Sequence, residues 1–118
     1  MDRLKKRAEF LAAQRGIRRV AGALTLELAP SPAGKADGFR VGFTASRKIG
    51  NAVARNRAKR RLRAAAAARL PLLARPGHDY VLVARASVLT RDFPLLLEDL
   101  AQAVKAAHQK LDAQKQGA

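Results

Sequence analysis

The residues with the clearest chemical potential form one basic segment, residues 51–63, which reads NAVARNRAKRRLR. It holds six Lys and Arg in thirteen positions and no Asp or Glu. Like charges at helical neighbour spacing repel, so a helix that only met solvent would normally include glutamates. Over residues 47–63 Arg outnumbers Lys six to two, and guanidinium groups suit bidentate contact with phosphates. The segment therefore predicts a phosphate-binding surface; a solvated basic face is the alternative.

The candidate binding residues have basic or amide side chains and lie in this segment or in the loop before it. They are Arg47, Lys48, Asn51, Arg55, Asn56, Arg57, Lys59, Arg60 and Arg63. Asn56 can donate and accept hydrogen bonds at once, as a 2′-hydroxyl or a base edge requires. The loop cations lie where a helix begins, and unpaired N–H groups there already favour an anion. Gly50 would let the backbone approach a phosphate closely, although a simple turn also explains a glycine.

Charge and composition point to the same kind of partner. The 118 residues suit one domain, and they carry a formal charge of +15. Eleven Lys and Arg fall between Asp37 and Asp79, with no acid among them. Such one-sided charge is typical of nucleic-acid binding. A basic membrane-surface helix needs bulky apolar residues on its other face, where this segment has mostly alanine.

The rest of the composition limits the location of the protein. The sequence has no cysteine, which excludes disulfides and thiolate metal sites. No apolar run approaches the roughly 20 residues of a membrane span, and no secretory signal is visible. We expect a single cytoplasmic, soluble RNA-binding domain over residues 1–118, without a membrane partner or an obligate protein partner.

The hydrophobic pattern predicts an α+β fold, a small α-β sandwich. We expect helices over residues 4–15, from 51 to about 70, and from about 92 to 111, with strands over 24–28, 39–46 and 78–86. The order is α-β-β-α-β-α, with room for one further strand before the basic helix. Residues 24–28 alternate like a half-buried strand. A turn-rich loop is expected over 29–38, and residues 112–118 should be frayed.

The chain offers no obvious catalytic group or metal site of its own. A protein nuclease usually needs clustered carboxylates for Mg²⁺, or histidines for acid–base work. The nine acids are scattered, and the adjacent pair Glu98 and Asp99 would point apart by about 100° on a helix. His78 and His108 are best explained as structural or solvated residues. We expect no catalytic residue, no metal ligand and no protein-bound cofactor.

The segment SRKIGNAVARNRAKRRLR closely resembles the signature of the bacterial ribonuclease P protein component. That family has a G-x-A-V-x-R-N-x-x-K-R frame. The frame is met here by Gly50, Ala52, Val53, Arg55, Asn56, Lys59 and Arg60. The opening LKKRAEF and the element order are also similar to the family's. The resemblance implies the small subunit of a ribonucleoprotein whose RNA, with Mg²⁺, removes the 5′ leader of precursor tRNA.

The resemblance implies three further features. The crossover around the basic helix should be left-handed, against the usual preference. A cleft between the first helix and the sheet should receive the single-stranded leader, with Phe10 stacking a base; core packing is the alternative for Phe10. Many members carry a second aromatic one turn later, where this sequence has Gln14, so the effect of Gln14 on the cleft is open.

Two other functions fit the composition. A structural RNA-binding protein of ribosomal type is the main alternative, and the specific motif argues against it. A DNA-binding helix-turn-helix protein ranks third, because no second helix at the proper angle precedes the basic one. The sequence does not indicate the preferred tRNAs, the stoichiometry of the complex or ions at a protein–RNA boundary.

Overall fold

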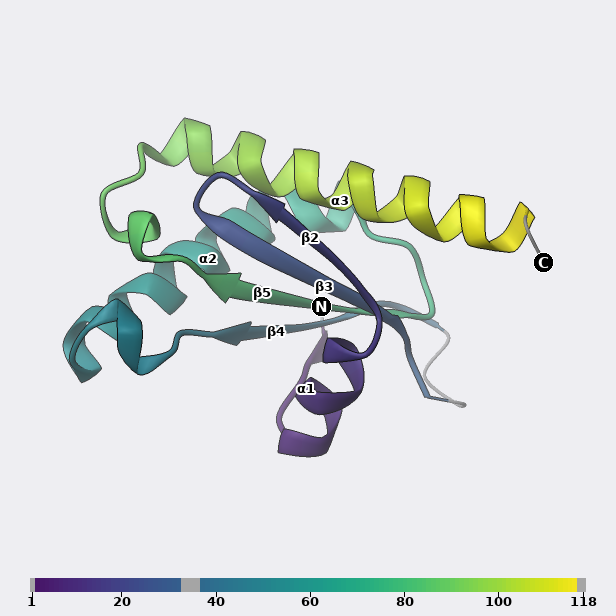
Figure 1. Cartoon of the computed structure of the whole chain (residues 1–118), viewed down its shortest axis with the longest axis horizontal. Helices are drawn as coiled ribbons and strands as arrows, with labels where there is room; N and C mark the ends of the chain where they lie inside the picture. The colour runs from purple at the N-terminus through teal and green to yellow at the C-terminus, as the bar shows by residue number, and fades with distance from the viewer. Residues whose placement is uncertain (1, 33–36, 117–118) are drawn as a thin grey trace.

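Three helices and one five-stranded sheet make up the described part of the computed structural model, residues 2–32 and 37–116 (Figure 1). The strands are β1 (Asp2–Arg3), β2 (Ile17–Ala21), β3 (Leu24–Pro30), β4 (Arg40–Thr44) and β5 (His78–Ala84). The helices are α1 (Arg7–Gln14), α2 (Ala52–Leu73) and α3 (Phe93–Gln116), with short 3₁₀ turns η1 (Arg47–Ile49) and η2 (Ala86–Leu89). The predicted α+β fold and element order are confirmed.

The sheet has the order β1-β4-β5-β3-β2 and mixes parallel with antiparallel pairs. Strand β5 pairs with β4 in parallel and with β3 antiparallel. Helix α2 makes the crossover between β4 and β5. The left-handed sense of this crossover stays a prediction from the family resemblance.

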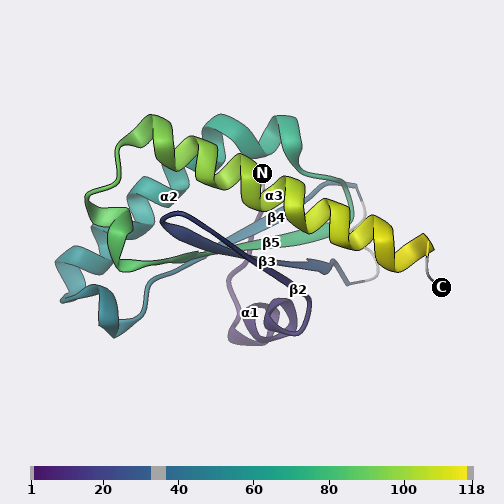
Figure 2. The same ribbon diagram turned by 45° about the horizontal axis from the view of Figure 1, so that its top comes forward.

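The two faces of the sheet are covered by different helices. Helices α2 and α3 lie on one face and α1 on the other (Figures 1 and 2). The main core packs Leu26 and Tyr80 of the sheet against Leu62 of α2 and Leu100 of α3. A smaller cluster under α1 contains Leu4, Ala13, Ala29 and Val81.

Strand β3 is buried on both faces, and the expectation of a half-buried strand was wrong. Thr25 and Glu27, which alternate with the core leucines, are only 3% and 5% exposed. The reason is α1, which packs on the face that alternation alone would leave to solvent. Strand β1, which has only two residues, was not predicted. Strand β2 is the further strand for which the predicted order left room, although its two arginines hide its apolar alternation.

A two-residue turn joins β2 to β3 and is held by α3. Gly22 lies at φ 51, where glycine is favoured, and a Cβ there would lie 2.2 Å from the Asp99 carboxylate. Asp99 accepts a hydrogen bond from the Ala23 N–H at 3.0 Å. It also accepts two from Arg91, each at 3.0 Å. The buried carboxylate of Asp99 therefore fixes the hairpin on α3.

Helix α2 begins as predicted but ends later. The Asn51 side chain accepts a hydrogen bond from the Ala54 N–H at 2.9 Å, as an N-cap does. The helix continues through Pro71 to Leu73, although an internal proline costs about 3 kcal/mol. Leu70 is fully buried and Leu73 packs on the core. Burial of a leucine contributes about 1.5–3 kcal/mol, which offsets the proline.

Helix α3, which was predicted, packs on the core through an apolar stripe. Leu96, Leu100, Val104 and Ala107 are buried along its inner face. The helix extends to Gln116, so residues 112–116, which we expected to fray, are helical. Residues 117–118 of that expectation, and residues 33–36 of the expected loop, lie outside the described part of the chain.

Candidate nucleic-acid interface

The first four turns of α2 present the predicted basic surface. Ala58, Leu62 and Ala65 are fully buried and seat the helix on the sheet. The side chains on its outer side are exposed, namely Asn56, Arg57, Arg60 and Arg63, while Arg55 and Lys59 are half-buried. Small inner residues and large outer cations thus give the helix one packed and one charged side. These turns lie at the end of the molecule opposite to the C-terminus (Figure 2).

The cations of this surface have no carboxylate partners in the described residues. The ion pairs found there belong to Arg40, Arg75 and Arg91. Arg55 instead donates to the Gly50 carbonyl oxygen at 3.2 Å. An uncompensated group of cations on one helix can bind a polyanion without first breaking internal ion pairs.

The loop before α2 contributes two more cations and a constrained glycine. Arg47 and Lys48 are exposed on η1, next to the first turn of α2. Gly50 has φ 145, a conformation that favours glycine. This conformation alone accounts for the glycine, so Gly50 needs no phosphate contact to explain it. The Asn51 side-chain oxygen Oδ1 accepts the capping hydrogen bond from Ala54. The side-chain N–H₂ group of Asn51 is therefore left to bind a ligand.

Arg61 has a structural contact that distinguishes it from its neighbours. Its guanidinium donates to the backbone oxygen of Arg91, just before α3. Its Nε atom is buried without a hydrogen-bond partner. Arg61 therefore joins α2 to the segment just before α3.

Two residues that the sequence did not single out border the basic surface. Arg3 of β1 lies over the Phe43 ring at 5.7 Å, and Arg63 of α2 lies over the same ring at 6.0 Å. Phe93, at the start of α3, is 37% exposed and lines a hollow of about 320 Å³ with Arg57 and Arg60. The sequence gave no signal for Arg3, whose position depends on β1 pairing with β4.

A second feature is a hollow between α1 and the sheet, where the family resemblance predicts the leader cleft. A cavity of about 520 Å³ is lined by Phe10, Gln14, Arg18, Glu27, Thr44, Ala45, Ser46 and Val83. It shares Arg18, Ser46 and Val83 with a neighbouring cavity of about 630 Å³, which Lys48 and Arg85 also line. We call these two adjoining cavities the α1 cleft. The structure thus brings Phe10, Gln14 and Lys48 to one continuous concave surface.

Phe10 packs in the core, as one of its two expected roles requires, and its ring also reaches the cleft. It packs against the small core cluster, and a Cβ on Gly42 would lie 2.5 Å from its ring. The ring is nevertheless half-buried and lines the cleft. Gln14, one helical turn later, is exposed beside it. One part of the Phe10 ring can therefore anchor α1 while another part contacts a ligand.

Glu27 is an acid within this otherwise basic cleft. It is 5% exposed and lines the cavity with Arg18. Burial raises the pKa of Glu27, and the positive charge of Arg18 opposes that shift. The alternation within β3 showed Glu27 only as the polar partner of core leucines, because a pattern within one strand does not show that α1 packs on that face.

Neither histidine lines the hollow beside the basic helix. His108 Nε2 and the Tyr80 hydroxyl are joined by a hydrogen bond of 2.7 Å, and burial lowers the pKa of His108. In the described ranges, no group of three His, Cys, Asp or Glu side chains could hold a metal ion. Over the same part of the chain, no helix is long and apolar enough to cross a membrane.

Fold and site together define a small α+β protein with a basic, exposed helix beside a concave sheet surface. Residues 1–108 match the family model described as Ribonuclease P. The chain therefore belongs to the ribonuclease P protein family. This membership favours the ribonuclease P interpretation over the ribosomal and DNA-binding alternatives.

Individual relatives agree with the family match. The ribonuclease P protein component of Ruegeria pomeroyi is 53% identical over 106 residues, covering 89% of this chain and 85% of the relative. That of Paramagnetospirillum magneticum is 50% identical over 109 residues, covering 89% and 81%. The RNase P protein of Staphylococcus aureus has a TM-score of 0.74 at 25% identity, covering 91% of this chain and 95% of that one. The RNase P protein from Thermotoga maritima has the same fold, with a TM-score of 0.72 at 23% identity, covering 90% and 97%.

Proposed function

We propose that this protein, as the protein subunit of ribonuclease P, docks α2 on the catalytic RNA and holds the 5′ leader of precursor tRNA in the α1 cleft. The observation that carries the proposal is the exposed row Asn56, Arg57, Arg60 and Arg63, free of carboxylate partners among the described residues. Such a row neutralises phosphates and positions an RNA helix.

The cleft is suited to a single strand. Phe10 offers an aromatic face for stacking, and Arg18 and Lys48 supply charge along the same hollow. Stacking on aromatic residues with cations along the backbone is how proteins hold single-stranded nucleic acid with little sequence preference. The leader of precursor tRNA is a single strand of this kind.

The protein's contribution is binding rather than bond breaking. In this proposal the catalytic RNA carries the Mg²⁺ and the chemistry, and the protein offsets phosphate repulsion and positions the leader. The protein itself holds no cofactor and needs no further protein partner. The complex acts in the cytoplasm, where tRNA precursors are made.

A reconstitution experiment tests the proposal. Purified protein is added to the catalytic RNA at a magnesium concentration too low for the RNA alone, and 5′ cleavage of precursor tRNA is followed. We expect cleavage to be restored with both components and to be absent with protein alone. Failure to restore cleavage would instead favour a purely structural RNA-binding role. Cleavage by repurified protein without RNA would reject the proposal that the RNA alone carries the chemistry.

A further inference from the structure

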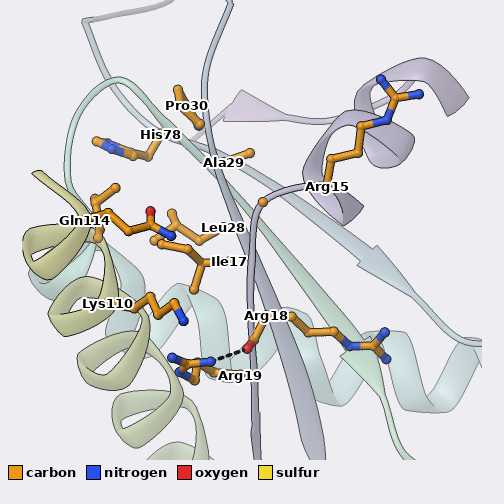
Figure 3. A pocket seen from close by; sticks show the side chains of 12 residues that line it. Arg15, Ile17, Arg18, Arg19, Leu28, Ala29, Pro30, His78, Lys110 and Gln114 are labelled. Carbon is orange, nitrogen blue, oxygen red and sulfur yellow. Dashed lines mark hydrogen bonds between the residues drawn. The ribbon is translucent and has the colours of Figure 1, made fainter. Parts of the chain in front are cut away.

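A pocket on the far side of β2 from α1 is not used by the proposed function. It has a volume of about 340 Å³ and lies between β2 and the C-terminal half of α3. Figure 3 shows Ile17, Arg19 and Lys110 on this side of β2. The basic turns of α2 lie at the other end of the molecule (Figure 1). We call this cavity the β2–α3 pocket.

The lining of the β2–α3 pocket combines an apolar floor with a cationic rim. Ile17 and Leu28 are 8% and 1% exposed and form the floor. Arg19 and Lys110 stand at the rim, while the Arg15 side chain points away from the pocket (Figure 3), and no carboxylate lines the pocket. Neither Arg19 nor Lys110 takes part in an ion pair within the described ranges. An apolar floor under unpaired cations fits a flat base attached to a phosphate.

Polar side chains at the pocket could contact a base or a ribose. The His78 ring hydrogen-bonds through Nδ1 to the Pro76 carbonyl oxygen at 2.9 Å. Because a carbonyl only accepts, Nδ1 carries the proton, and Nε2 of the neutral ring is an acceptor. Gln114 of α3 lines the same pocket and can both donate and accept.

Arg18 connects this pocket to the α1 cleft. It is in the lining of both cavities. Its backbone carbonyl, which accepts a hydrogen bond from Arg19 at 2.9 Å, is on the pocket side. Its side chain points to the other side of β2 (Figure 3). β2 is at one edge of the sheet, so a nucleic-acid strand can pass around it from one cavity to the other.

We infer that the β2–α3 pocket binds a nucleotide in the 5′ part of a long leader, after the leader has left the α1 cleft and crossed the edge of β2. The inference rests on the proposed function. The part of the α1 cleft next to Lys48 adjoins α2. Because α2 docks on the catalytic RNA in the proposed function, the cleavage site lies near this part of the cleft. The β2–α3 pocket lies at the opposite end of the leader's path. Lys110 and Arg19 hold the phosphate, and the base rests on Ile17 and Leu28.

The test compares two leader lengths in the reconstituted complex. Precursor tRNAs carry leaders of about 4 and about 16 nucleotides, the range that single-strand sites of small domains cover. Lys110→Gln and the double variant Arg19→Gln/Lys110→Gln are compared with the wild type. Lys105→Gln/Lys115→Gln on the same helix is the matched control, since both of its lysines are exposed and neither lines the pocket.

We expect each pocket substitution to weaken binding of the long-leader substrate about two- to tenfold. The log–log salt slope should fall by about 0.7 for each lost phosphate contact. Binding of the short-leader substrate, and of the catalytic RNA without substrate, should be unchanged. Because the exposed Lys110 can be replaced alone, the result does not depend on the stability of the double variant.

Crosslinking gives a second measurement. The chain has no cysteine, so Lys110→Cys provides a unique attachment point for a photoreactive group. In the long-leader substrate, crosslinks should form with the leader nucleotides that the short leader lacks. Crosslinks to the catalytic RNA, equal losses for both leader lengths, or no loss for either would overturn the inference. Failure of the wild type to support short-leader cleavage would reject the proposed function instead.

Discussion

Arg40 and Asp79 lie opposite each other on the parallel strands β4 and β5 and form a buried ion pair with two hydrogen bonds. Arg40 donates to the two Asp79 carboxylate oxygens at 2.8 and 2.6 Å. Arg40 also donates to Glu9 of α1, and Ser31 donates to Asp79 at 2.6 Å. This network ties α1 to the two central strands and so fixes one wall of the α1 cleft.

Removing one partner of this pair should destabilise the fold. Asp79→Asn leaves the Arg40 guanidinium, 7% exposed as a residue, with only Glu9 for charge compensation. Breaking a buried pair costs about 3–5 kcal/mol, and we expect a loss near the lower figure because Glu9 remains. The loss in the free energy of unfolding is measured by urea unfolding of Asp79→Asn, with Asp37→Asn at an exposed position as the control. Equal midpoints for the two variants would contradict the structural role of the pair.

Glu9 should make stability depend on pH in the acid range. Hydrogen bonds from the backbone N–H groups of Lys6 and Lys5, and from Arg40, lower the pKa of Glu9 from 4.5 to about 2. A carboxyl with a lowered pKa contributes stability above its unfolded value and loses it as pH falls toward the folded value. The contribution is therefore complete above about pH 4.5 and lost toward pH 2. Thermal melting of wild type and Glu9→Gln across this range should show the difference closing as pH falls.

The basic helix should account for most of the binding to the catalytic RNA. Arg55→Ala, Arg57→Ala and Arg60→Ala should each weaken binding and lower the log–log salt slope by about 0.7–0.9 per lost phosphate contact. The controls are Lys105→Ala and Lys115→Ala, which each remove one positive charge from an exposed position on α3. Titrations at several salt concentrations compare the two sets. Similar losses in both would indicate diffuse attraction instead of a docked helix.

Glu27 should reduce the stability of the protein at neutral pH. Burial raises the pKa of Glu27 in the folded state, so the folded protein binds this proton more tightly than the unfolded chain. Its contribution to the free energy of unfolding therefore falls as pH rises above about 4.5. We expect Glu27→Gln to raise the melting temperature near pH 7 and to have little effect near pH 4. A gain that did not grow with pH would show that charge burial is not the cause.

Local patterns were sufficient to predict most of the helices and strands. The leucine alternation of β3 and the apolar run of β5 indicate strands of the sheet, and the apolar spacing in α3 indicates a helix with one buried face. The predictions failed where a distant segment decides the outcome. The cover of Glu27 by α1 and the extension of α2 through Pro71 depend on packing between elements far apart in the sequence.

The sequence predicted the residues of the candidate site that lie on one helix, but not those whose positions depend on distant segments. The cations of α2 follow from spacing on one helix, and the structure places Asn56, Arg57, Arg60 and Arg63 on its exposed side. The positions of Arg3 and Glu27 depend on strand pairing and on α1. No periodicity within a single segment contains that information.

Phe10 should contribute to leader binding beyond its contribution to folding. Its ring packs against Gly42 and also lines the α1 cleft. Phe10→Leu keeps an apolar side chain on Gly42 but removes the stacking face. We expect it to weaken binding of leader-bearing tRNA by up to the roughly 1–3 kcal/mol of one stacked base. Binding of mature tRNA, which has no leader, should hardly change.

Gln14→Phe provides the complementary change, because Gln14 lies one turn from Phe10 on the same helix and is exposed in the same cleft. A second aromatic ring there should tighten leader binding and reduce its dependence on base identity, since every base has a face that can stack. Affinities for both substrates are measured beside a melting curve for each variant. If Phe10→Leu lowers stability and weakens both substrates equally, Phe10 is a core residue only. If Gln14→Phe also leaves leader affinity unchanged, the leader does not lie in this cleft.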